Sequence, residues 1–182
     1  MNAKQLQKQL YKLDESALTE LVAAYRLPLI AFVCTYIRDE FIAEDIVSDV
    51  FVRLLLKEPK LRDEKALKTY LFSVAKNMSI DYLRKRKREK AWVEEWKNTA
   101  GSKTGWFIEN DLIQSEEKKE LFNAIELLPS VYRETVYLHY FEEMPIEEIA
   151  KTMGKTKKQI YNLLARAKKL LSKKLEEGGG VK

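Results

Sequence analysis

The sequence predicts an all-α protein of two small helical domains joined by a flexible linker, with a helix-turn-helix in the second domain. The 182 residues include only six Gly and four Pro and are rich in Leu, Lys, Glu and Ala, a composition that favours helices. Apolar residues recur at helical spacing in both halves of the chain. Between the halves, residues 98–105 gather small and polar side chains, which is typical of a linker. We therefore expect domains at 1–90 and 112–176, a linker at 91–111 and a tail at 177–182.

The first domain is expected to begin with a short amphipathic helix within residues 2–15, followed by a helix whose apolar side starts at Leu18. Pro28 should interrupt or kink this second helix, because proline lacks the N–H group and crowds the preceding turn. The apolar run at 27–37 is too short to span a bilayer, which needs about 20 residues. It indicates a buried helix, and we expect no membrane insertion.

A third helix is expected over 42–57, ended by Pro59. One broad side of this helix is apolar and should face the core. The opposite side carries an acidic strip, formed by Glu44, Asp45, Ser48, Asp49 and Val52. An acidic strip favours a cationic partner. Many solvent-facing helices carry such a strip, however, so the strip alone is also consistent with an ordinary solvated helix face.

The next helix, Leu67 to Lys90, carries the most distinctive pattern in the chain. Its polar strip lies within about 80° of arc and consists of Tyr70, Ser73, Asn77, Asp81, Arg84 and Arg88. Six of the seven residues from Arg84 to Lys90 are basic. A ring can stack on bases, an amide can read a base edge, and cations can hold phosphates, so the strip predicts contact with nucleic acid.

The second domain is expected to hold four helices. Ser115 can cap the first, whose apolar side is Leu121, Phe122, Ile125 and Leu128. The second covers Ser130–Phe141, and Pro145 opens a short third helix. A glycine-centred turn at 153–155 then leads to Thr156 and Gln159, which form a capping box for a fourth helix from Lys157 to about Leu175. This order of elements is that of a helix-turn-helix.

The fourth helix divides into an apolar side and a polar side, as a DNA-reading helix must. Ile160, Leu164 and Ala167 belong to the side that should lock onto the preceding helices. The other side carries the candidate contacts to phosphates and base edges: Thr156, Lys157, Lys158, Tyr161, Asn162 and Arg166. A plain helical bundle with a lysine-rich exterior is the alternative, and the agreement of turn, cap and basic side favours DNA binding over it.

Composition excludes several other classes of protein. Cys34 is the single cysteine, so no disulfide framework exists within one chain, and with the absence of a signal sequence this favours the cytoplasm. The only histidine, His139, has no ligand-type spacing to Cys34, and no glycine loop for phosphates occurs. We therefore expect no metal site, no cofactor and no catalytic residues. The net charge of +5 favours a polyanionic partner.

Three segments together resemble bacterial RNA polymerase sigma factors of the extracytoplasmic-function group. AEDIVSDVFVRLL (43–55) is similar to the family's polymerase-clamp-binding helix, and TYLFSVAKNMSIDYLRKRKR (69–88) to its promoter-melting and −10-reading helix. LPSVYRETVYLHYFEEMPIEEIAKTMGKTKKQIYNLLARAKKLL (128–171) is similar to its −35-reading domain. The three occur in the family's order and spacing, so the resemblance covers nearly all of the chain except the linker.

The resemblance implies a role for each matching residue. Asp45, Ser48, Asp49 and Val52 would bind core polymerase, with Ser48 standing where the family usually has glutamine. The residues expected to bind −10 DNA are Arg62, Tyr70, Asn77, Asp81, Arg84, Arg86 and Arg88. The −35 contacts would come from the polar side of the fourth helix, where Leu163 replaces an arginine that many members carry.

The implied function is a promoter-specificity subunit that binds core polymerase through its clamp and flap, and recognises −35 and −10 elements in double-stranded and melted promoter DNA. An anti-sigma factor stays open as a further partner. Two alternatives remain: a stand-alone helix-turn-helix regulator, which leaves the acidic and polar strips unexplained, and a helical adaptor that binds only protein. The second predicts no salt-dependent affinity for DNA. The sequence assigns no role to Trp92, Trp96 and Trp106 in the linker.

Overall fold

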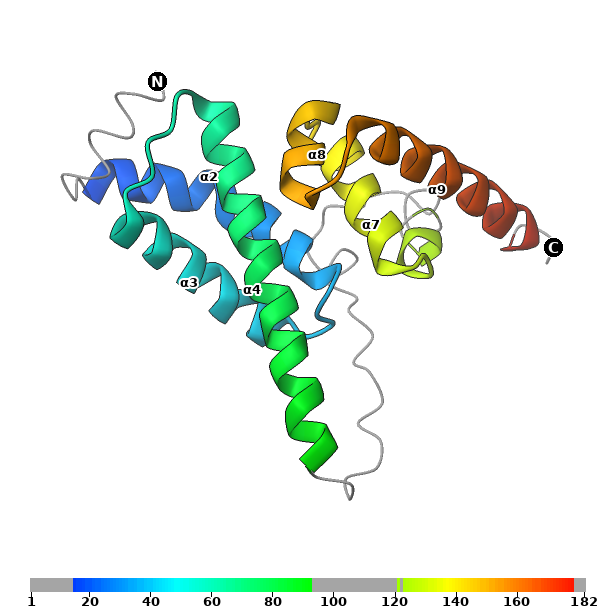
Figure 1. Ribbon diagram of the computed structural model, residues 1–182, viewed down its shortest axis with the longest axis horizontal. Helices are drawn as coiled ribbons and strands as arrows, with labels where there is room; N and C mark the ends of the chain where they lie inside the picture. Colours follow the sequence, from blue (N-terminus) through cyan, green and yellow to red (C-terminus); the bar gives the residue numbers. More distant parts are fainter. Residues whose placement is uncertain (1–14, 93–120, 122, 179–182) are drawn as a thin grey trace. The chain divides into compact units, whose positions relative to one another are not determined.

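The computed structural model describes residues 15–92, 121 and 123–178, and its helices group into two units. The described residues contain helices and connecting turns and no strand, as predicted for an all-α protein of two helical domains. Figure 1 shows helices α2, α3 and α4 in one unit and α7, α8 and α9 in the other. The lead-in helix expected at 2–15, Ser115, Trp96 and Trp106 lie outside the described residues, and the domain limits stay a prediction.

Helix α2, Glu15–Cys34, runs without a break through Pro28, so the proline does not interrupt the helix. Its second half is held by the core, since the residues from Leu29 to Cys34 are all buried. Burial of this half offsets the hydrogen bond that proline cannot donate. The helix ends at Cys34, where Thr35 donates its backbone N–H to the Phe32 carbonyl at 3.0 Å. The apolar run at 27–37 is therefore helical only as far as Cys34.

Among the described residues, α2 is the one helix long and apolar enough to cross a membrane by length and composition alone. Half of its apolar stretch is buried inside the first unit. A core helix that packs against α3 and α4 passes the same test of length and composition, and its burial accounts for its apolar character.

Helix α3, Glu40–Lys57, is capped by Asp39, whose carboxylate accepts the Ile42 N–H at 3.2 Å. It ends at Glu58, which adopts a left-handed conformation with φ 42° directly before Pro59. Lys57 is thus the last helical residue, as predicted. A proline at this point cannot continue the hydrogen-bond ladder and restricts the residue before it.

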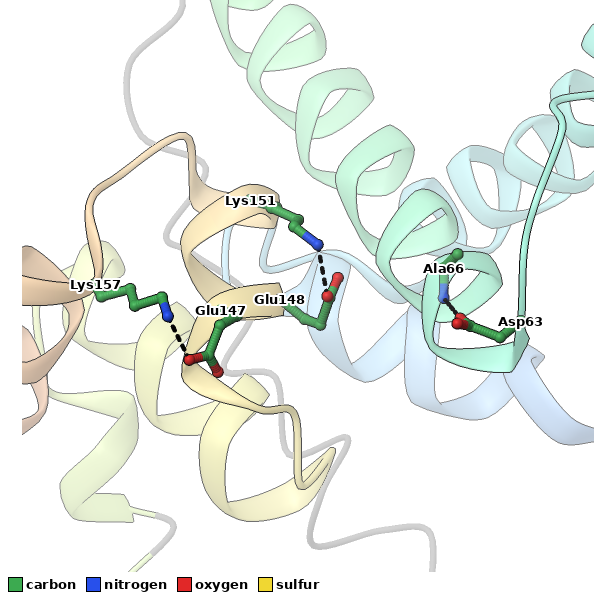
Figure 2. A network of polar contacts seen from close by, with 6 residues as sticks. All are labelled: Asp63, Ala66, Glu147, Glu148, Lys151 and Lys157. Atoms are coloured by element: carbon green, nitrogen blue, oxygen red, sulfur yellow. Dashed lines mark hydrogen bonds and ion pairs between the residues drawn. The ribbon is translucent and has the colours of Figure 1, made fainter.

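Helix α4, Glu64–Trp92, starts three residues before the predicted Leu67. Asp63 explains the earlier start, because its Oδ1 accepts the Ala66 N–H at 2.8 Å and satisfies one open donor of the first turn (Figure 2). The helix packs on the core through Leu67, Leu71, Phe72, Val74, Ala75 and Ser79. Phe72 meets the Phe32 ring edge-on with centroids 5.1 Å apart.

In the second unit, residues 121 and 123–126 are helical and precede α7, Ser130–Val136. The predicted helix Ser130–Phe141 is helical throughout, but its last turn is a π-helix, Tyr137–Phe141. Leu128 is buried as expected, whereas Leu121, which is 38% exposed, is not the core residue that its spacing predicted. Phe122 lies outside the described residues.

Two helices complete this unit: α8, Ile146–Met153, and α9, Lys157–Gly178. Pro145 precedes the first residue of α8, as predicted. Helix α9 continues past the expected end at Leu175. Ile160 and Ala167 on α9 are fully buried, and Ala167 joins a core cluster with Leu128 and Val136.

Candidate nucleic-acid interface and a second binding face

The acidic strip of α3 faces solvent. Asp45, Ser48, Asp49 and Val52 are all exposed, and Glu44 is partly buried. Glu44 forms an ion pair with Arg26 of α2, so its charge is already neutralised within the unit. Ser48 donates its hydroxyl to the Glu44 carbonyl at 2.9 Å, which leaves the Ser48 oxygen available only as an acceptor. The free negative charge of the strip therefore lies at Asp45 and Asp49.

Two large apolar side chains next to this strip are exposed and were not expected from the sequence. Phe41 is 82% exposed and Leu56 is 78% exposed. The predicted helix began at Ile42 and therefore left Phe41 out, although a helical projection extended by one residue places it beside Asp45. Because neither side chain contributes to the core, both are available to a partner.

The polar strip of α4 changes character along its length. Tyr70 and Ser73 are half-buried, whereas Asn77, Asp81 and Arg84 are exposed. Burial raises the pKa of the Tyr70 hydroxyl, and the positive charge of Arg53 on α3 partly offsets this. The phenol is therefore neutral near pH 7 and keeps its proton as a donor.

The basic end of α4 carries two exposed ion pairs within the helix. Arg84 lies 3.6 Å from Asp81, and Lys85 lies 3.9 Å from Glu89, all with well-exposed side chains. Asp81, Arg84, Lys87 and Arg88 line one surface hollow. Arg86 is half-buried and belongs to another side of the helix. The structure thus places Arg86 off the polar strip, and Arg62 lies exposed in the connection that precedes α4.

The turn between α8 and α9 has the geometry that the sequence predicted. Gly154 adopts φ 62°, a left-handed conformation that glycine takes without a steric penalty. The Thr156 N–H donates to Gln159 Oε1 at 2.8 Å, and the Gln159 N–H donates to Thr156 Oγ1 at 3.2 Å. These reciprocal bonds are the predicted capping box, and they fix the start of α9 relative to the turn.

All candidates of the −35 set are exposed, Thr156 directly before α9 and the others along it: Lys157, Lys158, Tyr161, Asn162 and Arg166. Lys157 donates to Glu147 of α8 at 2.6 Å, a pair that Figure 2 shows across the turn. The hydrogen bond from Lys157 lowers the pKa of the Glu147 carboxyl below its ordinary value, with Lys157 and Lys151 charges adding to the effect. Sequence reasoning missed Glu147, since it lies ten residues from Lys157.

These side chains form three exposed faces, one each on α3, α4 and α9. No group of three or more His, Cys, Asp or Glu side chains placed to hold a metal ion occurs among the residues described. The faces instead offer donors, cations, carboxylates and exposed apolar surface, which are the means of binding macromolecules.

Comparison with known families decides the identity. The model of Sigma-70 region 2 matches residues 21–89, and that of Sigma-70 region 4 matches residues 118–171. The chain belongs to the extracytoplasmic-function group of RNA polymerase sigma factors. It is therefore a transcription initiation factor whose partners are core RNA polymerase and promoter DNA.

Curated relatives and solved structures agree with this assignment. The sigma factor is 28% identical to the ECF sigma factor SigM of Bacillus subtilis over 152 residues, covering 84% of this chain and 91% of SigM. It is 26% identical to SigW of the same organism, covering 93% of this chain and 95% of SigW. The fold is similar to that of RpoE of Bartonella quintana bound to the anti-sigma factor NepR, with a TM-score of 0.70, 20% identity and coverage of 87% and 96%. It is also similar to CnrH bound to the cytosolic domain of CnrY, with a TM-score of 0.65, 19% identity and coverage of 94% and 96%.

Proposed function

We propose that this sigma factor directs initiation through three separate surfaces: α3 binds the polymerase clamp, α4 captures and melts the −10 element, and α9 reads the −35 element. The observation that supports this division of labour is the polar strip of α4, which passes from the half-buried Tyr70 through the exposed Asn77 to the exposed Arg84 and Arg88. A stacking ring, an amide and cations in one line can bind an unpaired base and the phosphates of the adjoining duplex together.

On α3, the proposed contact with the clamp of the large polymerase subunit uses Asp45, Asp49 and Val52. The two carboxylates are exposed and make no ion pair with another described residue, and 51% of Val52 is exposed. A face with carboxylates around an apolar side chain fits a partner helix with cations around an apolar pocket. Ser48 contributes as an acceptor only, because its proton is bonded to the Glu44 carbonyl.

On α4, Tyr70 supplies a stacking surface for an unpaired base, and Asn77 and Asp81 supply polar groups for base edges. Unstacking a base costs a few kcal/mol, which stacking and pocket contacts recover. Arg84 and Arg88 then hold phosphates of the adjoining duplex, and Arg62 approaches the displaced strand from the connection before α4. Arg86, on another side of the helix, would contact a different phosphate.

On α9, the proposed −35 contacts come from a helix whose start is fixed by the capping box. Lys158 and Arg166 are suited to phosphates, and Tyr161 and Asn162 are suited to base edges in a major groove. The second unit is also the proposed partner of the polymerase flap. Held by core polymerase at a fixed spacing, the two DNA-binding units gain affinity that neither has alone.

We infer that the protein performs no covalent chemistry, needs no cofactor and works in the cytoplasm, where transcription takes place. Opening DNA requires binding energy and no reaction at the protein, which accords with surfaces made of donors, cations and rings. An anti-sigma factor that covers the α3 or α4 face would block initiation, and the structurally similar RpoE of Bartonella quintana was solved in complex with the anti-sigma factor NepR.

The test is transcription reconstituted from purified bacterial core polymerase, this protein and a promoter library. We expect the protein to bind core polymerase and to select promoters with defined −35 and −10 elements. Failure to bind core polymerase would overturn the proposal. A protein that bound duplex DNA without polymerase, and repressed or activated from that site, would instead be a stand-alone regulator.

A further inference from the structure

Helix α3 carries three of the large apolar side chains that are exposed in the first unit: Phe41, Val52 and Leu56. Single exposed apolar residues are ordinary on a protein surface, so exposure alone decides nothing. The positions of the three side chains are informative, because at 100° per residue all three fall within about 60° of arc on one face of α3. Over the same face lie Asp45 and Asp49.

The spacing makes this a continuous strip along the whole helix. From Phe41 in the first turn to Leu56 in the last, the strip is about 22 Å long at 1.5 Å per residue. Phe41 and Leu56 lie at the two ends, and Asp45, Asp49 and Val52 follow one another between them. Glu44 is excluded from this free charge by its ion pair with Arg26.

No structural role accounts for the two apolar ends. Phe41 and Leu56 are 82% and 78% exposed, so they add little to the hydrophobic stabilisation of the unit. Helix propensity does not favour these two residues either, because alanine forms helices more readily than phenylalanine and at least as readily as leucine. We therefore expect a binding partner to cover the apolar side chains at these two positions.

We propose that Phe41 and Leu56 are the apolar anchors of the polymerase-binding face, one at each end of α3. The partner is a helix of core polymerase that places basic side chains opposite Asp45 and Asp49 and apolar side chains opposite Phe41, Val52 and Leu56. This inference rests on the proposed binding of core polymerase by α3. It extends that contact from the middle of the helix to its full length.

The physical basis is the usual anatomy of a tight interface. Large apolar groups in desolvated pockets carry most of the affinity, and charged pairs set orientation and association rate. The centre of α3 alone offers two small carboxylates, a hydroxyl that acts only as an acceptor, and a half-exposed valine. Phenylalanine and leucine at the ends supply most of the apolar area that this face can bury.

The experiment measures the affinity of the full-length protein for purified core polymerase at two ionic strengths. The variants are Phe41→Ala, Leu56→Ala and Asp49→Ala, with Leu83→Ala on α4 as the matched control, an apolar residue that is 37% exposed and outside the face. Phe41→Ala and Leu56→Ala should each weaken binding about tenfold at both ionic strengths. Asp49→Ala should weaken binding most at low salt, because screening reduces its contribution.

Each outcome separates the two proposals. Wild-type affinity for Phe41→Ala and Leu56→Ala, together with weakened Asp49→Ala, would overturn the anchors and keep the clamp contact. Loss of affinity in Leu83→Ala to the same degree would also overturn the anchors, because the effect would not be confined to this face. No binding of the wild type to core polymerase would overturn the proposed function itself. Unchanged far-ultraviolet circular dichroism and thermal midpoint in all variants confirm that folding is intact.

Discussion

The two proposed DNA-binding helices, α4 and α9, are supported in opposite ways. Helix α9 is fixed at its first residue by the reciprocal bonds of Thr156 and Gln159 and by the Lys157–Glu147 pair. Helix α4 is fixed along its first half, where Leu71, Phe72 and Ala75 are fully buried, and the ion pairs seen at its basic end, Asp81–Arg84 and Lys85–Glu89, lie within the helix.

This difference matches the two kinds of DNA that the helices are proposed to meet. A helix that enters a major groove must present its first turns at a set angle, so a fixed start is the useful support. A helix that captures an unpaired base needs rigid aromatic and amide groups beside a core, and cations that can follow the backbone beyond it.

Removal of the ring that anchors α4 should have the largest effect on stability. Phe72 is fully buried and packs edge-on against Phe32, so Phe72→Ala should lower the free energy of unfolding of the first unit by about 3–5 kcal/mol. Denaturant unfolding followed by circular dichroism measures this. Leu83→Ala, an exposed change on the same helix, is the control, and a cost as large as that of Phe72→Ala would show that α4 is not anchored at Phe72.

Asn77 on α4 and Asn162 on α9 should affect different steps of transcription initiation. Asn77→Ala should slow promoter opening about tenfold or more while core binding stays intact, because the amide is proposed to act on unpaired bases. A promoter already melted over its −10 element should restore most of the lost rate. Asn162→Ala on α9 is the matched variant, and it should weaken binding to duplex −35 DNA without rescue by melting. If Asn77→Ala loses core binding, the helix has another role.

Loss of the capping hydroxyl should have a moderate effect on the second unit. Thr156→Ala leaves the Gln159 N–H without its acceptor and should destabilise this unit by about 1 kcal/mol. Affinity for duplex −35 DNA should fall with it, because the start of α9 would be less well fixed. Thr156→Ser keeps an acceptor at the same position and should retain most of the stability and most of the DNA affinity. A serine variant with losses as large as those of the alanine variant would contradict a capping role.

The smallest effect is expected from Glu147, which binds Lys157 at the edge of the proposed groove-reading surface. Glu147→Gln removes the negative charge opposite Lys157 and should free this lysine for a phosphate. The logarithmic dependence of DNA affinity on salt concentration should then steepen by about one unit. Binding titrations at several salt concentrations measure it. Lys158→Gln should shift the dependence in the opposite direction, and an unchanged slope for Glu147→Gln would show that Lys157 does not reach DNA.

The Glu147–Lys157 pair should also make the stability of the second unit depend on pH. The Lys157 hydrogen bond lowers the pKa of Glu147 in the folded protein, so the unfolded chain takes up the proton first as pH falls. The stability that the pair contributes is present above the ordinary glutamate pKa of about 4.3 and is lost as pH falls through the lower, folded-state value. Comparison of wild type and Glu147→Gln by unfolding across this range should show a smaller loss in the variant.

Local chemistry explains why much of the architecture could be predicted. The Thr156–Gln159 box, the helix start after Pro145 and the helix end before Pro59 depend on residues a few positions apart, and the structure has all three. The two-sided pattern of α9 was also clear, because its buried and exposed residues alternate with a regular helical period.

The differences arose where tertiary packing decides the outcome. Pro28 does not break α2, because the buried residues after it hold the helix together. The sequence pattern predicted one regular helix over Ser130–Phe141, and it did not reveal the π-helical turn at Tyr137–Phe141. At the proposed sites, the Glu147–Lys157 pair depends on how α8 meets α9, which periodicity does not reveal.

The helical conformation of the basic end of α4 should depend on whether DNA is bound. Arg84 and Arg88 are four residues apart on one helix, a spacing at which like charges disfavour the helical state. No described residue of α4 after Ser79 is fully buried, so helix and coil are close in free energy at this end. A polyanion that binds the helical form stabilises it by mass action, by about 2.7 kcal/mol at a hundredfold excess over its dissociation constant. The backbone amides near Arg88 should therefore exchange with solvent quickly in the free protein and slowly on DNA, so that the length of α4 reports whether the promoter is occupied.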